Sequence, residues 1–161
     1  MGADLYIKSI SDERKKQFEP LFEAAVRLRD LAETEVQRQI AQEQVHKYYD
    51  EMYADGYFRD SYNLTSVMAR MELSWWNDVG PMLSKKTSNL SPRKAKRLLE
   101  IIRERQIQAL TVDEIRNAGG TIDDGENTIA NWVQFWIDQR LELIAFLEKA
   151  ISLKEPVYCS I

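Results

Sequence analysis

One segment constrains the fold of this chain more than any other. Residues 126–153 carry apolar side chains around nearly the whole circumference of a single long helix. A membrane-crossing helix needs about twenty predominantly apolar residues, and Asp138, Arg140 and Glu142 interrupt this one. A helix that is apolar on most sides is normally covered on most sides. We therefore predict that residues 126–153 form the long central helix of a bundle or lie in an oligomer interface.

Helical spacing of apolar residues predicts further helices, over residues 11–28, 33–55, 64–79, 91–110 and 111–119. Ser11 is the expected start of the first, and Pro20 is expected to kink it or to divide it in two. Ser91, followed by a proline, is a strong start for the fourth, since serine caps and proline suits the first helical position. Thr111 and Glu114 have the spacing of a capping box at the start of the fifth.

The expected fold class is all-α, an irregular bundle of five to seven helices. The length of 161 residues predicts one domain over residues 1–161, with short extended termini at about 1–10 and 154–161. A chain of this size buries roughly two-thirds of its unfolded surface, so it needs neither disulfides nor a metal to be stable. The apolar residues at the two termini, 5–7 and 157–158, could pair as short strands.

Several kinds of chemistry are excluded by the supply of residues. The chain has one cysteine, Cys159, and one histidine, His46, which cannot provide the four N and S ligands of a zinc site. Glu43, His46 and Asp50 share one helix face, but a carboxylate-bridged dimetal bundle uses two Glu-x-x-His motifs and this chain supplies one. A mononuclear site, or a site completed by a second subunit, stays open on the residues alone. No phosphate-binding loop, dinucleotide-binding motif or nucleophile elbow occurs. We assign no catalytic residue, cofactor or metal.

The cysteine count and the N-terminal sequence indicate where in the cell the protein is expected. A lone cysteine is unusual for a secreted protein, and the N-terminal residues lack the apolar core of a secretory signal. We expect a cytoplasmic protein without a membrane partner.

Positive charge is concentrated in one stretch. Residues 84–110 hold eight Lys and Arg against two Glu, a net charge of +6. The rest of the chain holds 14 Lys and Arg against 24 Asp and Glu, a net charge of −10. We single out Lys94, Arg97, Arg103 and Arg105 as a candidate interaction surface. A basic helix of this kind is the electrostatic footprint of a nucleic-acid-binding protein. It is equally suited to an acidic protein partner or to acidic helices of the same chain.

A second candidate surface lies between the second and third predicted helices, in a segment that we read as a connection. Tyr57, Arg59, Asp60 and Tyr62 form its densest group of polar and aromatic side chains, and connections often carry functional groups. The planar guanidinium of Arg59 suits a phosphate or a carboxylate, so an enzyme pocket at residues 57–63 is one interpretation. The alternative is that Arg59 pairs with Asp60 and the aromatic rings pack.

Paired aromatic residues suggest contact with another molecule. Neighbours on a helix point about 100° apart, so one of Trp75 and Trp76 should face outward or toward another element. We include Trp76 in the candidate surface, because exposed tryptophan is enriched in interface hot spots.

Three hypotheses for the function follow. The first is a non-enzymatic protein-interaction module with an unidentified protein partner. The second is a nucleic-acid-associated protein that binds through residues 91–110. The third is an enzyme with a pocket around residues 57–63. A homodimer formed through the last helix or the aromatic surfaces is compatible with all three.

Overall fold

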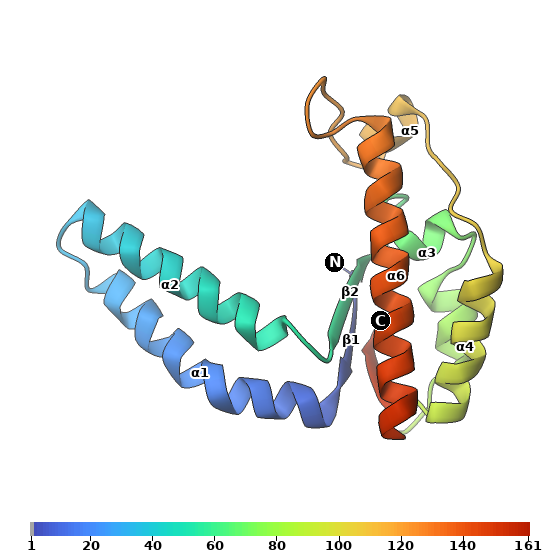
Figure 1. Cartoon of the computed structure of the whole chain (residues 1–161), viewed down its shortest axis with the longest axis horizontal. Coiled ribbons are helices and arrows are strands. Elements are labelled where there is room, and N and C mark those ends of the chain that lie inside the picture. The colour runs from blue at the N-terminus through green and yellow to red at the C-terminus, as the bar shows by residue number, and fades with distance from the viewer. Residues whose placement is uncertain (1) are drawn as a thin grey trace. The chain divides into compact units, whose positions relative to one another are not determined.

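Residues 2–161 are described by the computed structural model, and they group into two units (Figure 1). The length predicts one domain. The structure divides the chain into residues 7–57, which form a helical hairpin, and residues 2–6 with 58–161, which contain a sheet and the remaining helices.

The hairpin consists of α1 (Lys8–Asp30) and α2 (Glu35–Tyr53), which pack against each other along their length (Figure 1). The predicted start of α1 at Ser11 is wrong, since the helix begins at Lys8 and the Ser11 side chain is buried within it. Pro20 lies inside one continuous helix rather than between two.

A local signal sets the start of α2, and a glycine follows shortly after its end. The Thr34 hydroxyl accepts a hydrogen bond from the Gln37 backbone N–H, and the Gln37 side chain accepts one from the Thr34 backbone, which makes a capping box. Beyond the helix, Gly56 has a φ of +66°, a conformation that glycine adopts without strain. Its carbonyl accepts a bond of 2.8 Å from the Ile7 N–H at the base of the hairpin.

A four-stranded antiparallel sheet makes the all-α prediction wrong in part, although most of the chain is helical. The strands are β1 (Gly2–Ile7), β2 (Tyr57–Ser61), β3 (Asn89–Leu90) and β4 (Val157–Ser160), in the order β2-β1-β4-β3. The expected pairing of the two termini is confirmed, since β1 lies beside β4. The connection expected at residues 57–63 is largely strand β2. These strands are short and pair with distant parts of the chain, so helical periodicity does not detect them.

Strand β3 pairs with β4 with Asn89 opposite Tyr158 and Leu90 opposite Val157. The two terminal strands also share an aromatic contact, because the rings of Tyr6 and Tyr158 stack with centroids 5.5 Å apart. Side chains of β1 alternate between buried and half-buried, so one face of the sheet belongs to the core.

The long last helix, α6 (Ile129–Leu153), packs against α4 (Pro92–Glu104), α3 (Val67–Arg70) and the sheet (Figure 1). Its contact with the sheet is made by Phe146, whose ring centroid is 6.4 Å from that of Phe58 on β2. The prediction of a helix covered all round is supported in part. Leu143 and Leu147 are fully buried, but Leu141 remains 56% exposed, because these elements cover α6 on one side.

The third predicted helix, over 64–79, is interrupted. α3 ends at Arg70, Glu72 adopts a φ of +57°, and a π-helical turn, η1 (Trp75–Val79), follows. Gly80 then opens the short 3₁₀ turn η2 (Gly80–Met82), close to the predicted break.

The predicted caps of the next two helices are confirmed. Ser91 accepts a hydrogen bond from the Lys94 N–H at the start of α4, and Thr111 and Glu114 form the capping box of α5 (Val112–Asn117). Ile115 of α5 is fully buried in a small cluster with Trp136 of α6.

Candidate interaction surfaces

The seam between the hairpin helices is lined by few and mostly small buried side chains. Ala25 of α1 and Ala41, Val45 and Met52 of α2 are its buried apolar residues. Small residues let two helices approach closely, but they bury little apolar area. Most of the large apolar side chains near the tip of the hairpin lie outside this seam.

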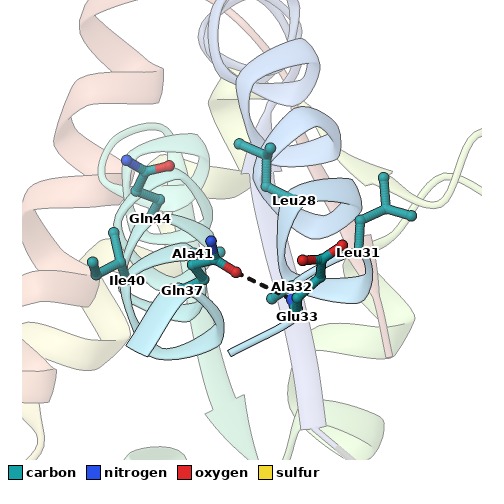
Figure 2. Close-up of a pocket in the computed structure, with 8 residues that line it drawn as sticks. All are labelled: Leu28, Leu31, Ala32, Glu33, Gln37, Ile40, Ala41 and Gln44. Atoms are coloured by element: carbon teal, nitrogen blue, oxygen red, sulfur yellow. Dashed lines mark hydrogen bonds between the residues drawn. The ribbon is translucent and has the colours of Figure 1, made fainter. Parts of the chain in front are cut away.

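These side chains border a groove at the tip, with a volume of about 410 Å³. We call this the hairpin groove, and Figure 2 shows the residues that line it: Leu28, Leu31, Ala32, Glu33, Gln37, Ile40, Ala41 and Gln44. Leu28 is 60% exposed, Leu31 77% and Ile40 54%. The Gln37 carboxamide oxygen accepts a hydrogen bond of 3.1 Å from the Glu33 N–H, which ties the loop to α2 (Figure 2).

The groove continues along α1 as a stripe of exposed residues. Leu21, Ala24, Leu28 and Leu31, which we call the leucine stripe, follow the spacing i, i+3, i+7 and i+10. This is the spacing of a coiled-coil seam, and none of the four carries a charge. Apolar periodicity in the sequence finds the helix but does not say which of its apolar residues face outward.

Another surface of the hairpin is polar. A hollow lined by Arg29, Glu35, Arg38, Gln39, Gln42, Glu43 and His46 lies there. The His46 ring nitrogen Nε2 is 2.6 Å from the Gln42 amide. Within residues 2–161, no three His, Cys, Asp or Glu side chains come together as a metal site would require.

The predicted basic surface divides into two halves along α4. Toward the start of the helix lies a concave surface that encloses a volume of about 580 Å³. It is lined by Ser91, Arg93, Lys94, Lys96, Arg97 and Glu100. None of its four cations forms an ion pair within residues 2–161. The opposite side of α4 is apolar and buried, with Leu98 and Ile102 in the core.

Toward the end of α4, the positive charges are neutralised within the chain. Arg103 pairs with Glu148 of α6, and Arg105 lies 3.7 Å from the Glu72 carboxylate. Of the four candidate cations, the structure therefore places Lys94 and Arg97 on the concave surface and gives Arg103 and Arg105 acidic partners.

The candidate pocket at residues 57–63 is split between two faces of β2. Arg59 is exposed and lies 3.7 Å from the Asp4 carboxylate, whereas Asp60 is buried on the other face. Tyr57 contacts Tyr53, with ring centroids 4.7 Å apart. The structure does not bring these side chains together around one cavity, because neighbours on a strand point to opposite faces.

Asp60 is an internal anchor for the segment that follows it. Its carboxylate accepts hydrogen bonds from the Ser66 hydroxyl, from the Val67 N–H at 3.0 Å and from the Trp75 indole N–H at 2.8 Å. It therefore joins the end of β2 to the first turn of α3 and to η1. From its sequence context Asp60 is expected in the candidate pocket, because no local signal shows that its side chain is buried.

The neighbouring aromatic pair is partly accessible. Trp76 is 58% exposed, and its ring centroid is 5.5 Å from that of Tyr62. Burial, together with the nearby Asp4 carboxylate, raises the pKa of the Tyr62 hydroxyl. The structure thus answers which of the adjacent tryptophans faces outward, since Trp75 is buried and bonded to Asp60.

A buried arginine was missed by the sequence reasoning. Arg70 of α3 is 7% exposed, and its guanidinium lies over the Trp136 ring, 5.6 Å from the centroid. Burial lowers the pKa of Arg70, while the Glu114 carboxylate acts in the opposite direction. The backbone carbonyls of Arg70 and Gln108 are both used in holding α3 to the segment after α4.

A scan against protein-family models and searches of curated proteins and of solved structures find no match to this chain. Among the helices of residues 2–161, none has the combined length and apolarity for a membrane crossing.

Proposed function

We propose that this chain is a non-enzymatic protein-interaction module and that the hairpin groove is its contact surface. The observation that carries the proposal is the exposure of Leu28, Leu31 and Ile40 around one groove. Exposed apolar side chains scattered singly are ordinary, but a contiguous patch rimmed by polar residues marks an interaction site.

The energetics of the hairpin support this reading. Fully burying a leucine or isoleucine side chain is worth about 1.5–3 kcal/mol, and this gain is largely unrealised for the three groove residues. Most of the stability of a helix in a protein comes from packing of its apolar face. A partner that covers the groove would provide that packing at the tip, where the seam between α1 and α2 buries little apolar surface.

The test is site-specific photo-crosslinking in the full chain. A benzophenone amino acid at position 28 should give a covalent adduct with a bound protein, because this side chain lies in the groove. The matched control is position 39, since Gln39 is on the polar hollow of the same hairpin. The proposal would be overturned if position 28 gave no adduct, or if its adduct were no more abundant than the one at position 39.

A second candidate function, nucleic-acid binding, is favoured by the concave surface of α4. Arg93, Lys94, Lys96 and Arg97 border it with the single acidic neighbour Glu100. Cations that lack internal ion pairs are available to neutralise phosphates, and neutralisation releases counterions from the nucleic acid.

Anisotropy of labelled random single- and double-stranded oligonucleotides tests this candidate. If the four cations each meet a phosphate, the logarithm of the binding constant should fall with that of the salt concentration, with a slope of about −3 to −4. Replacing Arg93, Lys94 and Arg97 by Glu should abolish binding, whereas Arg103→Glu is the control, because Arg103 is already paired with Glu148. If the protein binds neither oligonucleotide even at low salt, nucleic-acid binding is ruled out.

A further inference from the structure

We infer that the occupant of the hairpin groove is the hairpin groove of a second copy of this chain. Two α1–α2 hairpins would then associate about a two-fold axis into a four-helix bundle. This inference rests on the proposed function, and it names the partner that the surface fits.

The charge of the groove is the first argument. In a two-fold interface the same patch is present on both sides, so a charged patch would bring like charges together. Glu33 is the one charged residue among the eight that line the groove, and it lies in the loop between the helices. The leucine stripe has no charge. Apart from Glu33, this surface offers a charged partner no complementary charge, and its uncharged part can meet itself without repulsion.

The spacing of the exposed residues is the second argument. The two ends of the leucine stripe, Leu21 and Leu31, are ten positions apart on α1, or about 15 Å at 1.5 Å per residue. On α2, Gln37, Ile40 and Gln44 follow the spacing i, i+3 and i+7 and line the same groove. Both helices therefore present a seam of heptad type to the same side of the hairpin. Helices with such seams pack in four-helix bundles by inserting side chains between those of the facing helix.

Shape and hydrogen bonding agree with this arrangement. Ala24 leaves space in the middle of the leucine stripe for a large side chain of a facing helix. Gln44 borders the groove, and a carboxamide carries both donors and an acceptor. Two copies of Gln44 can therefore bond to each other across a two-fold axis, whereas a lone buried carboxamide would be left unsatisfied.

The size of the patch is sufficient for a dimer. Leu21, Leu28, Leu31 and Ile40 are each between 44% and 77% exposed. Together they give on the order of a few hundred Å² of apolar surface per copy, which is the scale of a functional patch. With the surrounding polar side chains, this supplies the apolar centre of a standard interface of about 800 Å² per partner.

Sedimentation velocity of the full chain over a range of concentrations tests the inference. The wild-type chain should form a reversible dimer. An acidic variant, Leu28→Glu with Leu31→Glu, and a basic variant, Leu28→Lys with Leu31→Lys, should each weaken dimerisation by at least ~100-fold, because like charges would face each other. Leu141→Glu on α6 is the matched control, since Leu141 is 56% exposed and should leave the dimer intact.

Mixing the acidic and basic variants gives the decisive result. If each groove meets the same groove, the two variants should form a one-to-one heterodimer although neither dimerises alone. Recovery of association in the mixture also shows that both variants are folded. A mixture that stays monomeric, or a wild-type dimer that Leu141→Glu breaks and the groove variants do not, would overturn the inference.

Failure of the inference can be distinguished from failure of the proposed function. A wild-type chain that is monomeric at every concentration, with a position-28 adduct whose mass requires a different protein, overturns self-association and leaves the interaction module standing. A monomeric chain without any adduct at position 28 overturns both.

Discussion

Replacing Asp60 by Ala should destabilise the sheet-containing unit strongly, because the carboxylate serves several buried donors. The Ser66 hydroxyl, the Val67 N–H and the Trp75 indole N–H would each lose their acceptor. A buried donor without a partner costs about 1–3 kcal/mol, so three give roughly 3–9 kcal/mol. Water entering the vacated space would replace part of this bonding, and we expect a loss of about 3–5 kcal/mol.

Asp60→Asn retains the shape and one acceptor but turns an NH₂ group toward donors. We expect an intermediate loss of about 2 kcal/mol. Equilibrium urea unfolding, followed by tryptophan fluorescence and by far-ultraviolet circular dichroism, measures both losses. The Trp75 indole N–H resonance in an NMR spectrum should shift in both variants, because it reports on the bond to Asp60 directly.

Asp124→Ala is the control, since Asp124 is exposed in a turn and its removal should change stability by no more than about 0.5 kcal/mol. A loss below about 1 kcal/mol for Asp60→Ala would contradict this prediction. It would mean that the donors find other partners and that Asp60 is not the anchor of α3 and η1.

Three further predictions concern single residues. Burial raises the pKa of the Cys159 thiol to about 12, so a thiol reagent at pH 8 should modify it at least ~100-fold more slowly in the native chain than in urea. Gly56→Ala should cost about 2 kcal/mol in urea unfolding, because the residue has a φ of +66° and an added Cβ would lie 2.7 Å from Ile10; an unchanged midpoint would contradict this. Hydrogen bonds from the Thr111 N–H and hydroxyl hold the pKa of Glu114 below its ordinary value of 4.5. The ionised Glu114 carboxylate therefore stabilises the folded chain at neutral pH, and this stabilisation is lost as the pH falls through the lowered pKa. Glu114→Gln should therefore be less stable than wild type at pH 7 and equal to it at pH 2, and a difference that persists at pH 2 would refute this assignment.

Much of the helical structure was predictable because its signals are local. Ser91 and the pair Thr111 and Glu114 stand in the sequence beside the N–H groups that they cap, and their helices begin where expected. The segregation of positive charge into one helix is also visible in the sequence. What the sequence did not show is that Arg103 already has an acidic partner, Glu148, which lies 45 residues away.

The candidate surfaces were predicted less well, for two physical reasons. Asp60 was grouped with Arg59 because the two are neighbours in the sequence, but in a strand neighbours point to opposite faces. The hairpin groove was missed because apolar periodicity identifies a helix without stating which apolar residues its partner covers. Ala25 and Leu28 contribute to the same pattern, yet one is buried and the other is exposed.

Most of the helices, the caps of α4 and α5 and the concentration of positive charge could be predicted from the sequence alone, since each depends on residues within a few positions of one another. The sheet, by contrast, depends on long-range contacts, since it pairs strand β1 with β4 about 150 residues away. The burial of Asp60 and the exposure of the leucine stripe also depend on the tertiary structure. Burial is set by which distant segments pack against a residue, and local spacing does not contain that information.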